Sequence, residues 1–300
     1  MSTANIVFLI NLQNGFIKKS LSKHQGGSFY IPGSEDIGEI AARLIRNMSN
    51  ATIILSQHYH PANHISFASQ HLGASLFSNI RLRLGTNGIY SVATTLSEND
   101  LDQTLWPDHC IQGTESALFA DEIMDALPTA LKDKLFEHSL DPSLRGFDGH
   151  GNIFHIIRSG MRPDLYSYGV VTENDGISIT TAPDIFEGLI KKYRGTNVTS
   201  VRIYIGGLAT NFGVEFSHKD IWLHLVPKLK ALGIKTEVSL LTDLSRGILY
   251  SAHAGEWPDL KDAPERMKAF GTSEITTDTA IRQNMFVRQR GTRQLLPHLS

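Results

Sequence analysis

Five short apolar runs, separated by stretches of helical periodicity, constrain the fold of this chain more than any other feature. Each run is rich in Ile, Val and Leu and only about five to eight residues long. Nearly continuous apolar character is typical of strands that are buried on both faces in a parallel sheet. The expected strands are residues 5–10, 51–56, 153–157, 200–206 and 235–242.

Helices are expected between and after these strands, because the intervening segments place apolar residues on one face at a period near 3.6. Strands and helices that alternate along a chain predict right-handed crossovers and a layered sheet. We therefore expect an α/β fold, a three-layer α/β/α arrangement with a mostly parallel central sheet. The expected helices are residues 35–47, 115–127, 182–193, 214–232 and 262–270.

We expect one domain, formed by residues 1–285. The stretch 138–152 is rich in Gly, Asp and Ser, which favours a loop, and we assign it to an insertion near residues 138–158. Residues 286–300 are polar and basic, so we expect them to form a C-terminal tail.

Composition excludes several classes of protein. A formal net charge of −2 does not point to nucleic acid or to an anionic membrane surface as a partner. No apolar run approaches the roughly 20 residues that span a bilayer, and the first residues lack the basic leader of a signal peptide. The single cysteine, Cys110, excludes an intrachain disulfide and fits a reducing compartment. We expect a cytoplasmic protein.

Three histidines follow the second expected strand within seven residues: His58, His60 and His64. His58 and His60 are two apart on an extended segment and therefore point the same way. A Pro-Ala-Asn turn then allows the chain to fold back and bring His64 beside them. Neutral imidazole is a good ligand for Zn, Fe, Ni or Cu. The alternative is a polar loop whose histidines face water.

A second cluster, residues 106–114 (WPDHCIQGT), precedes an expected helix. His109 could supply a fourth metal ligand, and Trp106 a flat wall for an aromatic ligand. Cys110 could be a nucleophile beside a base, but a single cysteine is more often a small buried apolar residue.

A third cluster, residues 205–214 (IGGLATNFGV), takes a strand into a Gly-rich turn and then a helix. Backbone amides at the start of a helix can bind an anion or an oxyanion. The side chains of the turn include Thr210 and Asn211, and neither is obviously activated as a nucleophile. A turn that needs glycine only for tight packing is the alternative.

Taken together, these clusters resemble the nicotinamidase/pyrazinamidase branch of the isochorismatase-like hydrolases. The family pattern Asp-x-Gln-Asn-Asp-Phe is matched by residues 11–16 (NLQNGF), and Ser-Gln-Asp-Trp-His-Pro-x-x-His-x-Ser-Phe by residues 56–67. Trp-Pro-x-His-Cys-Val-Gln-Gly-Thr is matched by residues 106–114, and Gly-Leu-Ala-Thr-Asp-Tyr-Cys-Val by residues 207–214. The motifs occur in family order over roughly residues 4–280.

The resemblance implies a catalytic Asp, Lys and Cys, and this chain has none of them at the matching positions. The Asp position is Asn11, which cannot act as a base at ordinary pH, and the Cys position is Gly213. Aligning residues 159–168 on the family's Lys-Gly-x-x-Pro-x-x-x-Ser-Tyr gives Ser159 at the Lys position, whereas another register gives His138. We therefore expect no intact catalytic group.

The positions implied for binding are better preserved. The family's metal ligands are an Asp and several histidines, and they fall on His58 (at the Asp position), His60, His64 and His109. One divalent transition metal is therefore expected, with zinc first. The ligand-binding residues are expected to be Phe16, Trp106, Leu208 and Ala209.

Three functions follow as hypotheses. The leading one is a pseudoenzyme that keeps a pocket for a small molecule, such as a pyridine carboxamide, and a metal. The second is a hydrolase of a C–N amide bond acting through metal-activated water or Cys110. The third is a structural role in a homo-oligomer. Neither nucleic acid nor membrane is expected as a partner.

Overall fold

The computed structural model describes residues 2–249 and 260–293, with side chains described as far as residue 285. A seven-stranded sheet runs through its centre in the order β10-β9-β8-β1-β2-β7-β6. All neighbouring strands are parallel except β6 and β7. The strands are β1 (Ser2–Ile10), β2 (Thr52–His58), β6 (Ser143–Phe147), β7 (Ile153–Ser159), β8 (Val198–Leu208), β9 (Lys235–Arg246) and β10 (Ser273–Ile275).

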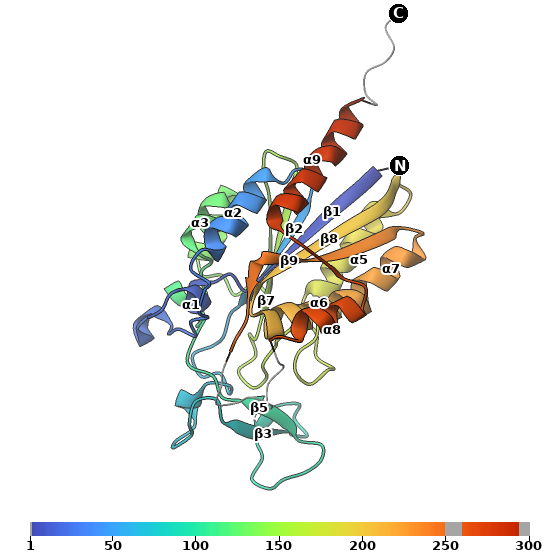
Figure 1. Cartoon of the computed structure of the whole chain (residues 1–300). Coiled ribbons are helices and arrows are strands. Elements are labelled where there is room, and N and C mark those ends of the chain that lie inside the picture. Colours follow the sequence, from blue (N-terminus) through green and yellow to red (C-terminus); the bar gives the residue numbers. More distant parts are fainter. Residues whose placement is uncertain (1, 250–259, 294–300) are drawn as a thin grey trace, which may run out of the picture.

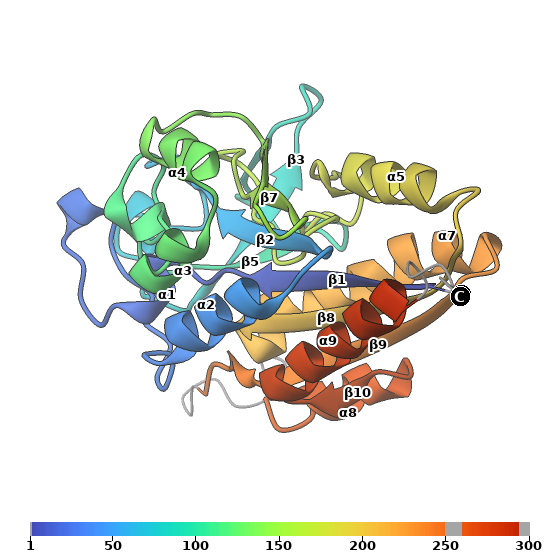
Figure 2. The same ribbon diagram turned by 90° about the horizontal axis from the view of Figure 1, so that it is seen from above.

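Helices cover both faces of this sheet, as Figure 2 shows for α2 and α9 on one side and α5 and α7 on the other. The α-helices are α1 (Asn14–Ile17), α2 (Ile37–Asn47), α3 (Asp121–Ala126), α4 (Thr129–Phe136), α5 (Ala182–Tyr193), α6 (Glu215–Asp220), α7 (Val226–Ala231), α8 (Ala263–Ala269) and α9 (Thr277–Arg293). Shorter helical segments are η1 (Lys23–Gln25), η2 (Ala68–Gln70), η3 (Glu115–Ala117), η4 (Thr210–Val214) and η5 (Ile221–Leu225). The expected three-layer fold is confirmed.

The continuous apolar character of the strands has the predicted cause. In β1, Val7 and Leu9 pack into a core with α2, α3 and α4, whereas Ile6, Phe8 and Ile10 pack into a second core with α5, α7 and α8. A strand with a core on each face must be apolar at every position. Among the described helices, none combines the length and apolar character that crossing a membrane requires.

The structure shows regular elements in two segments for which we expect a loop and a tail. Residues 143–147 form the antiparallel edge strand β6 instead of a loop, because Leu144 and Gly146 turn inward while their neighbours face outward. The expected insertion near 138–158 also contains β7, which lies inside the sheet between β2 and β6. Residues 286–293 belong to α9 instead of a tail; residues 294–300 lie outside the described residues.

A small antiparallel sheet, which the sequence did not reveal, lies below the main body in Figure 1. Its order is β4-β3-β5, and its strands are β3 (Asn79–Leu84), β4 (Tyr90–Val92) and β5 (Leu101–Thr104). It is tied to the main body where the backbone of Tyr90 donates a hydrogen bond to Asp164 Oδ2 (2.9 Å).

The candidate residues meet at the carboxyl ends of the central strands. Ile10 at the end of β1 lies opposite Ser56 in β2 and Gly207 in β8, and His58 at the end of β2 lies opposite Ser159 in β7. The approach of β1 to β8 requires glycine at position 207, where a Cβ would lie 2.0 Å from the Ile10 carbonyl oxygen. Ligands of parallel α/β sheets bind at this edge.

Candidate functional site

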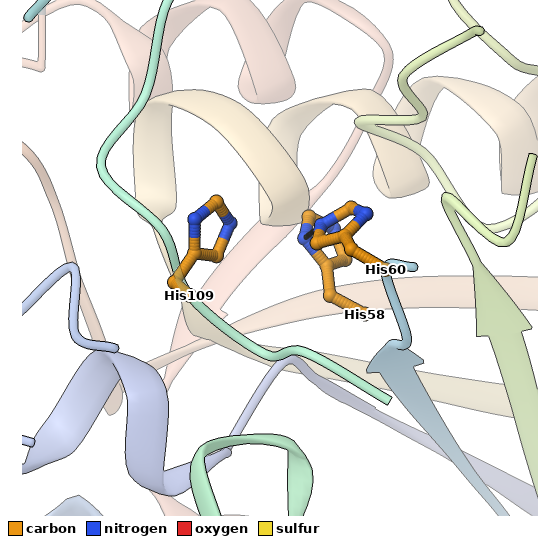
Figure 3. Close-up of side chains that lie close together, drawn as sticks. All are labelled: His58, His60 and His109. Carbon is orange, nitrogen blue, oxygen red and sulfur yellow. Dashed lines mark hydrogen bonds between the residues drawn. The ribbon is translucent and has the colours of Figure 1, made fainter. Parts of the chain in front are cut away.

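Three histidines converge at this edge of the sheet. Figure 3 shows His58 and His60, from the end of β2, beside each other and facing His109 from the loop before η3. Backbone hydrogen bonds fix the two segments together: His60 N donates to the Cys110 carbonyl (3.0 Å), and Gln112 N to the His60 carbonyl (2.8 Å). One nitrogen of each imidazole lies within 4.8 Å of the others, which suits a shared metal ion.

Hydrogen bonds set the tautomers of two of these rings. His60 Nδ1 lies 2.9 Å from the Gly160 carbonyl oxygen, and His109 Nδ1 lies 2.7 Å from that of Pro107. A carbonyl oxygen only accepts, so Nδ1 carries the proton in both rings and Nε2 keeps its lone pair. Gly160 is required here, because a Cβ at that position would lie 2.3 Å from the His60 ring. Both Nε2 atoms are therefore available to a metal.

Burial keeps the imidazoles neutral. Loss of solvation lowers the pKa of His58 and of His60 well below 6.5, and lowers that of His109 to about 4. The neighbouring imidazoles lower the pKa of His58 and His60 further. Neutral imidazole is the form that binds metals, so the donor set fits an ion such as zinc at neutral pH.

His64, which we expected as a ligand, is placed differently. Its ring centre lies 4.6 Å from that of His60. However, its Nδ1 lies 2.8 Å from Ser66 Oγ, and its Nε2 lies 3.2 Å from the Leu165 carbonyl oxygen. Burial lowers its pKa to about 3. Among the described residues, the group of possible metal donors contains His58, His60 and His109 but not His64.

Asn11 connects the histidines to the third cluster. Its Oδ1 accepts a hydrogen bond from Ser56 Oγ (2.7 Å), and its Nδ2 lies 3.2 Å from His58 Nε2. On the other side, a Cβ built at Gly213 would lie 2.8 Å from Asn11 Nδ2 and 2.7 Å from the Leu208 carbonyl oxygen. The space beside Asn11 therefore has no room for a side chain at position 213.

Beside these residues lies a cavity of about 330 Å³, including space that is open to solvent at its mouth. All four expected ligand-binding residues line it. The aromatic lining residues are Phe16, Phe29, Trp106, Tyr166, Tyr168 and Phe212, and the others are Asn11, Ile31, His58, Leu208, Ala209, Gly213 and Ile248.

The aromatic residues form continuous walls. Phe29 stacks on Trp106 with ring centres 5.3 Å apart, and Phe16 lies 5.2 Å from the ring of His109. Tyr168 lies 4.9 Å from Tyr166 and 5.5 Å from Phe212. Flat, apolar walls with few polar atoms favour a small aromatic ligand.

Neither candidate for the lysine position lines the cavity. Ser159 is buried at the end of β7, where its carbonyl oxygen accepts a hydrogen bond from Tyr59 N (3.0 Å). His138 is exposed and lies near Gly113. The guanidinium of Arg158, next to Ser159, is bound by Gln57 Oε1 (2.9 Å) and stacks over the Tyr59 ring. The described lining therefore holds no lysine, arginine, carboxylate or thiol.

Cys110 is fully buried and is not part of this lining. Its side chain would lie 2.9 Å from a Cβ at Gly15, and burial raises its pKa well above 9. A thiol that is buried and protonated is a poor nucleophile. The small apolar interpretation of Cys110 fits these surroundings better than the nucleophilic one.

The sequence did not single out several lining residues. Tyr166 lines the cavity, but nothing in its spacing along the sequence indicates such a role. Phe29 comes from the loop after α1, which folds back so that Phe29 N donates to the Gly15 carbonyl (2.7 Å). No local pattern of the sequence shows such a path.

Comparisons with known proteins find relatives that are similar in sequence and in fold, although no family model matches the chain. A nicotinamidase of Acinetobacter baylyi is 30% identical over 216 residues, which are 71% of this chain and 72% of that protein. The yeast nicotinamidase Pnc1p bound to the inhibitor nicotinaldehyde has a TM-score of 0.59 at 19% identity, over 91% of this chain and 99% of that one. A pyrazinamidase of Pyrococcus horikoshii in complex with zinc has a TM-score of 0.51 at 21% identity, over 91% and 98%.

Proposed function

Because the chain belongs to the nicotinamidase family, we propose that it is a member without amide hydrolysis that binds a small aromatic amide-like ligand and one divalent transition metal. The observation that carries this proposal is the pairing of Asn11 with Gly213. These residues occupy the positions of the expected carboxylate and thiol, and they leave no space for a nucleophilic side chain.

The carboxylate, thiol and lysine that the family reaction needs together supply most of its rate acceleration. Removing a general base alone typically costs about 10²–10⁴-fold. A nucleophile, its base and its charge stabiliser act as a unit, so losing the nucleophile removes most of the acceleration. In this chain all three positions are substituted, and the lining offers no replacement. Hydrolysis at a useful rate is therefore not expected.

Ligand binding requires fewer intact residues than catalysis does. The stacked Phe29 and Trp106 offer a flat apolar wall to a ring, and the amide of Asn11 is a polar group in the lining of the cavity. The yeast relative holds nicotinaldehyde and the Pyrococcus relative holds zinc. A pyridine carboxamide and zinc are accordingly the first ligands to test.

A second candidate is a hydrolase that depends on the metal. Three imidazoles with a free fourth position are the donor set of catalytic zinc, which supplies a water of lowered pKa. The grouping of His58, His60 and His109 favours this candidate. The version that uses Cys110 has less support, because that thiol is buried outside the cavity.

The deciding experiment measures ammonia release from nicotinamide and, in parallel, the shift of the melting temperature by nicotinamide, nicotinate and nicotinaldehyde. We expect no ammonia and a stabilisation of up to about 2.7 kcal/mol at 100 times the dissociation constant. Ammonia release that a chelator abolishes would establish the second candidate. Release that persists in Cys110→Ala and without metal would overturn both candidates.

A matched pair of variants locates the binding. Phe29→Ala removes a ring that stacks on Trp106, so the ligand-induced shift should decrease. Phe147→Ala removes an exposed ring on the edge strand β6, and the shift should remain. Equal shifts in both variants would place the ligand elsewhere, and no shift with any of the three compounds would remove the support for a pyridine ligand.

A further inference from the structure

The phenol oxygen of Tyr166 lies among the imidazoles. Tyr166 Oη is 3.3 Å from His58 Nδ1 and 3.4 Å from His109 Nε2, and His60 Nε2 is 3.2 Å from His58 Nδ1. Donors held at roughly 2.0–2.1 Å from a tetrahedral ion lie about 3.3–3.4 Å from one another. The four atoms are Tyr166 Oη, His58 Nδ1, His60 Nε2 and His109 Nε2. The three distances given between them are therefore close to the distances between neighbouring ligands in a tetrahedral site.

The surroundings fix the position of this hydroxyl. The Tyr166 ring stacks on His60 with centres 5.2 Å apart and lies edge-on to His58 at 5.4 Å. Its backbone carbonyl accepts a hydrogen bond from Asn174 N (2.9 Å). The side chain is only 3% exposed. A buried hydroxyl between two rings is held in place before any ion binds, which lowers the cost of ordering the site.

His64 is not one of the proposed metal ligands, but it holds the segment that carries Tyr166 in place. The Leu165 carbonyl can only accept, so His64 Nε2 carries a proton toward it (3.2 Å), and Nδ1 accepts from Ser66. Both ring nitrogens are thereby engaged. Because Leu165 is adjacent to Tyr166, this bond fixes the backbone that carries the phenol. His64 is a positioning residue in this arrangement.

We propose that the metal ion is held by His58, His60, His109 and the Tyr166 oxygen, with no position left for water. This inference rests on the proposed function, since it assumes that the histidine group holds a metal. As the ion binds, the phenol proton passes to solvent, as is usual when protein ligands bind a metal. Four protein ligands make a closed site of the structural type, which argues against the metal-dependent hydrolase.

The test compares the unmodified chain with Tyr166→Phe, Tyr168→Phe and His64→Gln. Each protein is purified without nickel resin, stripped with a chelator and titrated with zinc against a competing indicator. Tyr166→Phe should weaken zinc binding by at least about 10–100-fold, the loss that is typical even for groups one shell further from a metal. Tyr168→Phe, which removes a neighbouring phenol that contacts none of the three histidines, should leave the affinity unchanged. His64→Gln should still bind one zinc per chain.

Spectra give a second measurement that does not depend on affinity. Cobalt(II) in the unmodified chain should show the intense visible bands of a four-coordinate ion, and copper(II) should show a phenolate charge-transfer band. Tyr166→Phe should lose the copper band and alter the cobalt spectrum, whereas Tyr168→Phe should keep both. Melting of the metal-free proteins checks that each variant is folded, so that a loss of metal is not mistaken for unfolding.

Several outcomes would overturn the inference. Equal zinc affinity and equal cobalt spectra in the unmodified chain and Tyr166→Phe would exclude Tyr166 as a ligand. Loss of zinc in a folded His64→Gln, with retention in Tyr166→Phe, would make His64 the fourth ligand. No zinc binding by the unmodified chain would exclude the site altogether. The proposed loss of hydrolysis and the proposed ligand binding are tested separately by the ammonia and melting measurements, so they can survive any of these results.

Discussion

At the scale of single residues, Asn11 and Gly213 behave as one unit. The amide of Asn11 bonds to Ser56 on one side and faces His58 on the other. The same Nδ2 atom would lie 2.8 Å from a Cβ at position 213. Exchanging either residue alone therefore alters the environment of the other, and a thiol at position 213 would meet an amide that cannot remove its proton.

Gly213→Cys alone is predicted to produce no nicotinamidase and a less stable protein. The added Cβ would lie 2.7 Å from the Leu208 carbonyl oxygen, which belongs to the backbone and cannot turn aside. Overpacking of this kind typically costs about 1–3 kcal/mol. Urea unfolding measures the loss, and ammonia release measures the activity.

Gly188→Cys on α5 is the matched control, because a Cβ there would meet nothing within 4 Å. It should leave the free energy of unfolding nearly unchanged. The triple change Asn11→Asp, Gly213→Cys and Ser159→Lys restores the three residues that the resemblance implies and is measured beside the single change. Turnover of nicotinamide by Gly213→Cys alone would contradict the interpretation of Asn11.

At the scale of elements, the strands that could be predicted from the sequence are those that are buried on both faces of the sheet. The strands β1, β2, β7, β8 and β9 were predictable, because covered strands must be apolar throughout. The strands β3, β4, β5, β6 and β10 were missed, because each is short and partly exposed. The end of α9 was missed because a helix, once nucleated, continues through polar residues that would not start one.

A local sequence pattern likewise predicts one part of the candidate site and not the other. The spacing of His58 and His60 within one extended segment is enough to predict that their rings point the same way. Tyr166 and Phe29 reach the cavity from loops whose paths depend on tertiary contacts, such as the hydrogen bond from Phe29 N to the Gly15 carbonyl. A local pattern cannot carry that information.

The contact between α6 and the segment after α8 is predicted to weaken in acid. His218 is buried and lies 2.5 Å from Thr272 Oγ1 through Nε2, and burial lowers its pKa from 6.5 to about 4. The unfolded chain therefore takes up this proton first as the pH falls. Stability from the neutral ring is complete above about pH 6.5 and is lost between pH 6.5 and 4, at most about 3 kcal/mol in all.

Urea unfolding at several pH values between 7.5 and 4.5 measures this effect. His218→Gln cannot titrate, so the decrease in stability toward acid should be smaller than in the unmodified chain. His150→Gln, at an exposed position, is the control for exchanging a histidine for glutamine. If the free energy of unfolding changed equally with pH in all three proteins, His218 would not contribute to the loss of stability in acid.

At the scale of the whole molecule, the metal is predicted to stabilise the fold and not only the loops that hold it. His58 and His60 follow β2, His109 lies on a segment paired with that strand end, and β2 is central in the sheet. An ion that binds only the folded chain adds about 2.7 kcal/mol at 100 times its dissociation constant, or roughly 5–10 °C in melting temperature. Melting with a chelator and with added zinc measures the difference.

His109→Gln, which removes one donor, should lose most of that shift, and His150→Gln should keep it. A melting temperature that does not respond to zinc or chelator, or that responds equally in His109→Gln, would mean that the histidine group does not hold the ion.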